Sequence, residues 1–213
     1  MSALKEDLYL RNIKYQIIKG KIITNMAPPP SPNHNIISNE LNVFFKNFLK
    51  GKKCRVYHDS NSIRLDIIQK EKNIKLPDEC KKDSYIPDVM IVCDRTIDTI
   101  NGVTGAPTLV IEVLSKGTME YDITIKKEVY ELIGVEEYWI VNPQSKSIEI
   151  YVLKNGKYFL WNIYHQYSQD ELNLIETENE YLKTPQVIIT EFSPYSFPDL
   201  IIKVDDVFDD LIE

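Results

Sequence analysis

Apolar residues recur at helical spacing in two stretches of the chain. In the first, roughly residues 32–49, they stand three and four positions apart after a proline that can occupy the first helical position. In the second, MEYDITIKKEVYELIG, they recur as far as Gly134. The spacing predicts two amphipathic helices, the first ending near Gly51 and the second at Gly134, because glycine readily adopts the left-handed conformation that follows a helix.

Short β-branched runs bounded by turn residues predict the strands of a sheet. The runs are KYQIIKGKIITNM, CRVYHD, SIRLDII, PDVMIVC, PTLVIEVL, EEYWIVNP and IEIYVLKNGKYFLWNIYH. The first would turn at Gly20 and the last is a hairpin turning at Asn155-Gly156. The polar stretch 69–85 is typical of a loop. Since a helix connects 108–114 to 137–141, a right-handed crossover would set these two strands parallel in one sheet.

Composition is that of an ordinary globular chain, with 213 residues, 43% of them hydrophobic and 27% charged. No apolar run approaches the 18 or more residues that a membrane span needs. The first fifteen residues carry charges where a secretory signal would be apolar. We therefore expect a cytoplasmic protein without a membrane partner.

Three cysteines, Cys54, Cys80 and Cys93, are far apart in the sequence and form no CxxC motif. An odd number of cysteines at such spacing indicates neither a disulfide framework nor a zinc site. We expect buried or idle thiols.

Charge is unevenly distributed along the chain, whose formal net charge is -7. Residues 46–82 hold eleven lysines and arginines against five acids, and residues 166–213 hold twelve acids against two lysines. The net charge argues against simple nonspecific binding to nucleic acid. The basic stretch is either a solvated surface or a patch that faces phosphates, and the sequence leaves both open.

Two of the predicted strands each contain a single acid, Asp88 in PDVMIVCD and Glu112 in TLVIEVLSKGT. A buried carboxylate must be paired, protonated or bound to a cation. If the two strands are neighbours, their acids can converge on Mg²⁺, which proteins commonly hold through one or two carboxylates. A nearby lysine would complete a site for cleaving phosphodiesters.

This combination of PD, a spaced acid and a lysine resembles the PD-(D/E)XK nuclease superfamily. Within it the chain resembles the Uma2 family of restriction-endonuclease-like proteins. The resemblance runs from YQIIKGKIITNMAPPPSPNHNIISNEL through PDVMIV, GAPTLVIEVLSKGT, D-x3-K-x3-Y, GVEEYWIVNP and IEIYVL to SFPDLIIKVDDVF. The ordered string over 87–151 carries most of its specificity.

The resemblance implies that Asp88 and Glu112 bind the metal and that Lys126 supplies the catalytic ammonium. The lysine usually found two residues after the second acid is absent, because position 114 is Leu. Supporting residues matched by the family pattern are Asp122, Tyr130 and His34. Asn142 stands where the family usually has Asp, and we expect it to cap the exit of its strand.

Structural interpretations compete with these roles. Asp122, Lys126 and Tyr130 recur at i, i+4 and i+8, on a stripe beside the apolar stripe of Ile125, Val129, Leu132 and Ile133. Asp122 and Lys126 could be no more than an i,i+4 ion pair worth roughly 0.3 to 0.5 kcal/mol. Tyr130 could be packing, and His34 a polar contact at a helix start. His58 and His165 are isolated, and we expect them to be structural.

The sequence therefore predicts an α/β domain of restriction-endonuclease-like fold, with a central mixed β-sheet flanked by helices. We expect one domain over 1–213, with a core at about 30–151 and strand additions at 8–26 and 148–204. The expected function is Mg²⁺-dependent hydrolysis of nucleic acid, with Mn²⁺ as a substitute metal, DNA as the substrate and a homodimer as the assembly. The alternative is a catalytically silent nuclease-like module that binds nucleic acid or a protein partner.

Overall fold

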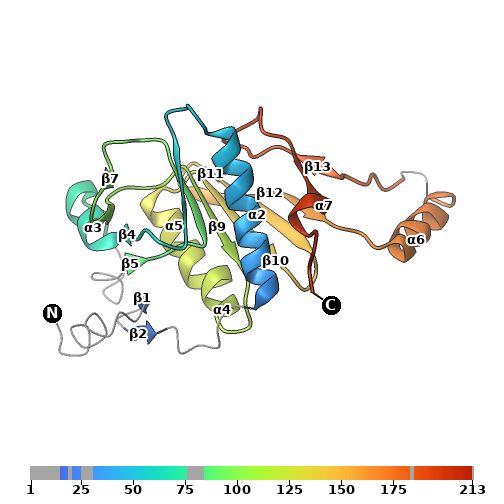
Figure 1. Cartoon of the computed structure of the whole chain (residues 1–213), viewed down its shortest axis with the longest axis horizontal. Helices are drawn as coiled ribbons and strands as arrows, with labels where there is room; N and C mark the ends of the chain where they lie inside the picture. Colours follow the sequence, from blue (N-terminus) through green and yellow to red (C-terminus); the bar gives the residue numbers. More distant parts are fainter. Residues whose placement is uncertain (1–14, 19–20, 25–30, 76–83, 183–184, 213) are drawn as a thin grey trace.

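A six-stranded mixed sheet forms the centre of the structure, a computed structural model that describes residues 15–18, 21–24, 31–75, 84–182 and 185–212 (Figure 1). The strands lie in the order β12-β11-β10-β9-β6-β3. Their bounds are β3 Arg55–His58, β6 Val89–Val92, β9 Leu109–Val113, β10 Glu137–Asn142, β11 Ser147–Lys154 and β12 Lys157–His165.

One pair in this sheet is parallel, and it is the pair that the sequence predicts. β9 and β10 run parallel, whereas the other neighbours, β3 with β6, β6 with β9, β10 with β11 and β11 with β12, are antiparallel. The β9–β10 crossover is a continuous helical run made of α4 (Met119–Tyr121), a π-helical turn η2 (Asp122–Lys126) and α5 (Lys127–Ile133). Gly134 ends the run at a φ of 90°, as predicted.

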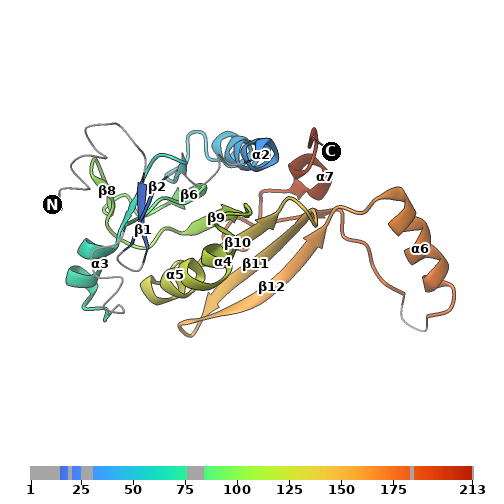
Figure 2. The same ribbon diagram turned by 90° about the horizontal axis from the view of Figure 1, so that it is seen from below.

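Helices cover both faces of the sheet (Figure 2). On one face lies α2 (Pro32–Phe48), whose Ser31 hydroxyl accepts the His34 N–H and caps the helix. Ile37, Leu41 and Phe45 are fully buried, and each contributes roughly 1.5 to 3 kcal/mol of burial free energy. The opposite face packs on α5 through an aromatic core that includes Tyr85, Tyr130 and Tyr138. The helix predicted at 32–49 is thus confirmed.

The hairpin predicted at Asn155-Gly156 is also confirmed. Both residues have positive φ, 53° and 77°, which is the conformation of a two-residue type I′ turn between β11 and β12. At the end of the preceding strand, Asn142 Oδ1 accepts hydrogen bonds from the N–H groups of Gln144 and Ser145. Asn142 therefore caps the strand exit, as its position predicted.

Smaller elements surround this core. Two short strands near the start, β1 (Tyr15–Ile18) and β2 (Lys21–Thr24), pair as predicted, although Gly20 lies outside the described residues. The rest are a small sheet with order β5-β4-β8-β7 (Ser84–Tyr85, Ile63–Arg64, Gly102–Val103, Asp98–Thr99), a β13–β14 pair (Glu191–Phe192, Ile202–Lys203) and helix α7 (Val204–Val207). No helix in the described ranges is long and apolar enough to cross a membrane.

The strand prediction for 62–68 is wrong beyond its first residues. β4 covers only Ile63–Arg64, and helix α3 covers Leu65–Lys72. Leu65 and Ile68 are three positions apart and both fully buried, so the helical period decides the conformation over the β propensity of the isoleucines. Part of the predicted loop at 69–85 is therefore helical, and its residues 76–83 lie outside the description.

Helix α6 (Gln169–Asn179), which the sequence reasoning missed, lies within the C-terminal additions. Its start is a capping box in which Ser168 and Glu171 satisfy each other's backbone N–H groups. The S-x-x-E spacing was available in the sequence as a signal. In both views α6 projects away from the sheet beyond the end of β12 (Figures 1 and 2).

The prediction of unpaired thiols is wrong for two of the three cysteines. Cys54 and Cys93 form a disulfide, and Cys80 lies outside the described residues. The pairing follows from strand register, because Arg55 is opposite Val92 and the next pair along the antiparallel strands is Cys54 and Cys93. Their separation of 39 residues in sequence gave no sign of this.

Candidate active site

The two strand acids stand opposite each other at one end of the sheet. β6 and β9 are antiparallel neighbours, with Val89 opposite Ile111. Extending this register by one residue places Asp88 opposite Glu112, so their side chains leave the same face of the sheet as direct cross-strand neighbours. Like charges in this arrangement destabilise the folded state. The sequence has therefore concentrated negative charge at one point, at a cost to stability.

Asp88 is held in place through one carboxylate oxygen. Its Oδ2 accepts the Val113 N–H at 2.7 Å and lies 3.1 Å from His34 Nε2. Burial alone would raise the pKa of Asp88, but the hydrogen bond and charge of His34 outweigh it and lower that pKa. The pKa of His34 is raised in turn, because pairing with Asp88 outweighs burial. The Asp88 side chain keeps 18% of its surface exposed, so solvent reaches it.

Glu112 is buried, with 1% of its surface exposed, and both of its oxygens are engaged. Tyr130 donates its hydroxyl to Oε1 at 2.7 Å, and Lys126 Nζ lies 2.8 Å from Oε2. Burial raises the pKa of Glu112 to about 8, with the neighbouring carboxylates of Asp122 and Asp88 adding to the effect and Lys126 opposing it. Burial likewise raises the pKa of the Tyr130 hydroxyl well above its usual value.

Lys126 lies between two carboxylates. Its Nζ is 2.8 Å from Asp122 Oδ1 as well as 2.8 Å from Glu112 Oε2, and its side chain is only 4% exposed. Burial would lower the pKa of Lys126, but the charges of Asp122 and Glu112 hold it above its ordinary value. Burial raises the pKa of Asp122. One ammonium therefore serves two buried carboxylates, so the three groups carry an excess of negative charge when all are ionised.

The backbone that carries Asp122 and Lys126 is a π-helical turn, Asp122–Lys126. Such turns are rare inside α-helices and occur frequently at functional sites. Tyr138, on β10, donates its hydroxyl to the Asp122 carbonyl at 2.8 Å. The sequence did not single out Tyr138, because its place in an apolar strand indicates only a buried side chain.

The predicted placement of the helix stripes is wrong in part. Leu132, expected in the buried stripe, is 38% exposed, whereas Asp122, Lys126 and Tyr130 are buried against the sheet. Asp122 and Lys126 do form the i,i+4 ion pair considered for them, but the pair is buried and Lys126 also contacts Glu112. Apolar residues alone therefore do not identify the buried face, because polar groups that find partners there can occupy it: Lys126 pairs with Asp122, and Tyr130 donates to Glu112.

All six residues predicted for the site lie in one region of the structure. His34 contacts Asp88, Asp88 faces Glu112 across the strands, and Glu112 connects through Lys126 to Asp122 and directly to Tyr130. Their chemical roles stay predictions. The two arginines of the basic stretch 46–82 are not part of this network: Arg55 pairs with Asp98, and Arg64 pairs with Asp66.

The donor set suits a hard cation held by few protein ligands. In the described part of the chain, no group of three or more His, Cys, Asp or Glu side chains is placed to hold a metal ion. Mg²⁺ often binds through only one or two carboxylates and keeps its remaining ligands as water. Asp88 and Glu112 supply those two carboxylates, and Asp88 Oδ1 accepts no hydrogen bond from the described residues. The residues present therefore fit Mg²⁺.

Comparison with known proteins identifies a family and a shared fold. The model of the Uma2 family, described as "Putative restriction endonuclease", matches residues 5–181. An uncharacterized protein of Synechocystis sp. (strain ATCC 27184 / PCC 6803 / Kazusa), slr1290, is 28% identical over 122 residues. The match covers 57% of this chain and 57% of that relative. A crystal structure of a "putative nuclease belonging to DUF820" from Anabaena variabilis ATCC 29413 superimposes with a TM-score of 0.63 at 16% identity, covering 95% of this chain and 96% of that one. This similarity shows a shared fold.

Proposed function

The chain belongs to the Uma2 family, and on that premise we propose that it is a metal-dependent nuclease that hydrolyses phosphodiester bonds in nucleic acid. We further propose DNA as the substrate and Mg²⁺, replaceable by Mn²⁺, as the cofactor. One observation carries the proposal: Asp88 and Glu112 face each other across two strands, with a buried lysine 2.8 Å from the second acid. A purely structural role would not require two opposed acids.

Asp88 and Glu112 would hold the cation in this site. A bound Mg²⁺ supplies an activated water and neutralises charge on the scissile phosphate. His34 fixes the orientation of Asp88 through Oδ2 and leaves Oδ1 for ligation. Tyr130 fixes Glu112 in the same way through Oε1.

Lys126 would stabilise the negative charge that develops on the phosphate in the transition state. Its ammonium is already positioned by Asp122, which lies on the same helical run and holds Nζ at 2.8 Å. Because Lys126 also contacts Glu112 Oε2, its charge would lie beside a metal ion bound by Glu112. A preorganised charge of this kind costs no reorganisation during the reaction.

A specific observation also favours the second candidate, a catalytically silent nuclease-like module that binds nucleic acid or a protein partner. Both oxygens of Glu112 are engaged by Tyr130 and Lys126, so ligation of a metal has to share or displace one of these contacts. In a silent module this network would be a closed, purely structural cluster.

Cleavage assays separate the two candidates. Supercoiled plasmid, single-stranded DNA and RNA would each be incubated with Mg²⁺, with Mn²⁺ and with EDTA, using Asp88→Asn as the inactive control. We expect cleavage of DNA with either metal and none with EDTA or with the variant. A folded protein that binds these nucleic acids but cuts none of them would support the silent module, and preferential cleavage of RNA would correct the substrate.

We propose a homodimer, because two copies of one site related by a two-fold axis can cut both strands of a duplex. β12 is one of the two edge strands of the sheet, and apolar side chains on it are about half exposed: Phe159, Leu160, Trp161 and Ile163 at 55, 50, 48 and 40%. Light scattering at micromolar concentration should therefore report twice the 24.8 kDa of one chain. A single species of 24.8 kDa would contradict this prediction.

We also propose that the protein acts in the cytoplasm. The Cys54–Cys93 disulfide argues instead for an oxidising compartment, because cytosolic thiols are normally kept reduced. Alkylation of free thiols in intact cells, followed by mass spectrometry, should find both cysteines alkylated. Protection of both cysteines from alkylation in the same intact cells would place the protein in an oxidising compartment.

A further inference from the structure

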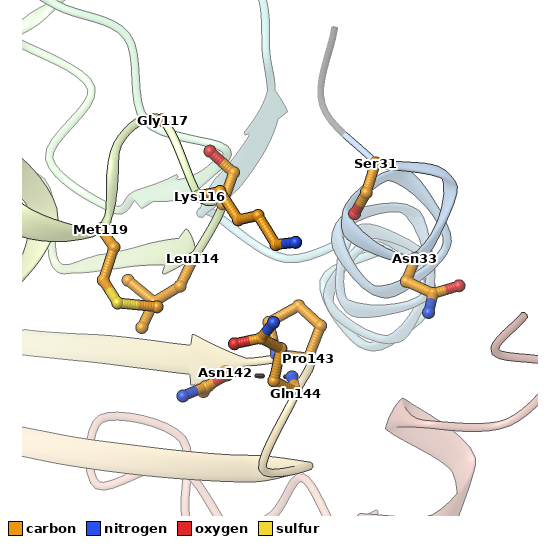
Figure 3. A pocket seen from close by; sticks show the side chains of 10 residues that line it. Ser31, Asn33, Leu114, Lys116, Gly117, Met119, Asn142, Pro143 and Gln144 are labelled. Atoms are coloured by element: carbon orange, nitrogen blue, oxygen red, sulfur yellow. Dashed lines mark hydrogen bonds between the residues drawn. The ribbon is translucent and has the colours of Figure 1, made fainter. Parts of the chain in front are cut away.

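A pocket of about 430 Å³ opens beside the candidate active site (Figure 3). Three segments form its walls: the loop from Leu114 to Met119 that follows β9, the first residues of α2, and the turn that follows β10. The same loop and the same helix start lead directly to Glu112 and His34. The pocket is therefore built on the elements that position the candidate catalytic groups.

The pocket is positively charged in a protein whose net charge is -7. None of its ten lining residues is acidic, and one of them is Lys116. In Figure 3 the Lys116 side chain extends from the loop toward α2 and ends between the loop and the helix. Lys116 makes no ion pair with any described carboxylate, so its charge is available to a ligand. These features select an anion.

Backbone donors in the pocket are also available. The N–H groups of Ser115, Lys116 and Gly117 make no hydrogen bond to any described residue. At the start of α2, the N–H groups of His34 and Asn35 bond to Ser31, which leaves that of Asn33 without a described acceptor. The first turn of this 17-residue helix contains no acid, so the positive end of its dipole is not compensated.

An apolar surface completes the pocket. Leu114, Met119 and Pro143 lie below and beside Lys116 in the view of Figure 3. Asn33 is not available to a ligand through its side chain, because its amide bonds to the backbone of Ile212. A site with an ammonium, free N–H groups and an apolar surface suits a phosphate that carries an organic group, as each nucleotide does.

The pocket lies about one nucleotide from the candidate catalytic acids. Leu114 comes two residues after Glu112, which at roughly 3.3 Å per residue along a strand is about 7 Å. Ser31 comes three residues before His34, or about 5 Å along the helix axis. One strand of nucleic acid could therefore contact both places at once.

We propose that this pocket binds the phosphate adjacent to the one that is cleaved, and that Lys116 is the side chain that recognises it. This inference rests on the proposed nuclease function and adds to it a subsite for the substrate backbone. It assigns Lys116 a binding role, distinct from the role proposed for Lys126. The pocket contacts the sugar and phosphate backbone, so it should increase affinity without reading base sequence.

A salt titration can count this contact. Binding of a short fluorescein-labelled single-stranded DNA would be measured by anisotropy in EDTA, which prevents cleavage, at several salt concentrations. The variant is Lys116→Gln, and the matched control is Lys203→Gln, an exposed lysine outside the pocket. Loss of one phosphate contact should make the slope of log K against log salt shallower by about 0.7 and weaken binding roughly tenfold at low salt.

A second measurement locates the contact. Thymidine 5′-phosphate would be titrated into ¹⁵N-labelled protein in EDTA, and we expect the amide signals of Asn33, Ser115 and Gly117 to shift in the wild type but not in Lys116→Gln. Equal salt slopes for the wild type and Lys116→Gln would overturn the subsite. So would equal losses in Lys116→Gln and Lys203→Gln, or a wild-type protein that binds no DNA.

The outcome is separable from that of the proposed function, because neither binding assay requires cleavage. A protein that cuts DNA with Mg²⁺ but shows no change of slope in Lys116→Gln remains a nuclease and lacks the subsite. A protein that never cuts, yet loses slope and amide shifts in Lys116→Gln, binds phosphate here and is not the nuclease proposed.

Discussion

Two buried glutamates on neighbouring strands have opposite surroundings. Glu112 on β9 faces the α5 layer. Glu137 on β10 shares the opposite face of the sheet with Trp139 and Val141, the face that packs against α2. Both are almost completely inaccessible to solvent, and burial raises the pKa of both. Burial therefore does not distinguish them.

The partners of the two acids differ in charge. Glu137 accepts three hydrogen bonds from neutral donors: Trp139 Nε1 at 2.7 Å, the Tyr195 N–H at 2.9 Å and the Ser196 N–H at 2.7 Å. It thereby ties the segment after β13 to the central sheet. Glu112 instead shares one lysine with Asp122 and lies opposite Asp88.

The comparison separates a structural acid from a candidate functional one. Neutral donors satisfy a buried carboxylate without adding charge, which is what a structural contact requires. A cluster of three acids with one lysine and one histidine leaves negative charge in excess unless a proton or a cation is bound. The Glu112 site is therefore suited to a cation, and the Glu137 site is not.

Replacing each glutamate with glutamine should produce the largest contrast. Glu112→Gln removes a proposed metal ligand but leaves Lys126 paired with Asp122, so we expect a folded protein whose cleavage rate falls by about 10³-fold or more. Glu137→Gln places an amide group against N–H donors, so we expect a loss of about 1 to 3 kcal/mol in the free energy of unfolding and normal cleavage per folded molecule.

Plasmid cleavage and urea denaturation measure these two effects in the same preparations. The assignment of Glu112 would be refuted by a glutamine variant that cuts at the wild-type rate. Equal losses of stability and of activity in both variants would show that the two acids do not differ as proposed.

Removing the lysine should have the next largest effect. Lys126→Met keeps most of the side-chain volume but leaves Glu112 and Asp122 buried without their cation, which typically costs about 3 to 5 kcal/mol. Cleavage should fall by roughly 10² to 10³-fold if the ammonium also stabilises the transition state. The control is Lys127→Met, since Lys127 is next in sequence but lies over the Tyr151 ring.

Added Mg²⁺ sharpens this prediction. A divalent cation bound beside Glu112 would replace the missing charge, so Mg²⁺ should stabilise Lys126→Met more than it stabilises the wild type. Thermal unfolding with and without Mg²⁺ measures the difference.

The same loss of cleavage in Lys126→Met and in the control Lys127→Met would indicate that general basicity, and not the position of Lys126, affects the reaction.

Local signals explain most of what the sequence predicts about the fold. The spacing of Ile37, Leu41 and Phe45 gives the first helix, Asn155-Gly156 gives the hairpin, and a helix between two β-branched runs gives the parallel pair. Each of these features depends on residues close together in the sequence. The Cys54–Cys93 disulfide and the segment held by Glu137 depend on strand register and tertiary packing, which no local pattern encodes.

The candidate site shows the same limit. The resemblance to a family selected six residues that lie together in the structure, but the spacing of Asp122 and Lys126 is identical for an exposed pair and a buried one. Which of the two occurs depends on the sheet face beneath the helix. There Glu112 pairs with Lys126, and the Tyr138 hydroxyl donates to the Asp122 carbonyl. Burial, and with it the stability effects expected here, comes only from the three-dimensional structure.

The last expected effect is the contribution of Glu112 to the dependence of stability on pH. Its pKa is about 8 in the folded protein and near 4.5 when unfolded, so between these values the folded state holds a proton that the unfolded state has lost. The folded state then binds more protons, and the free energy of unfolding must fall as pH rises. The fall can reach about 1 kcal/mol per pH unit and should end above pH 8. Glu112→Gln lacks this proton, whereas Glu137, whose pKa is also raised, contributes to both proteins and cancels in their difference. Urea denaturation of both proteins from pH 5 to 9 should therefore show the wild type losing stability relative to Glu112→Gln up to about pH 8 and remaining level beyond it. A difference that stays constant over this range would mean that Glu112 is ionised throughout, with Lys126 fully compensating its charge.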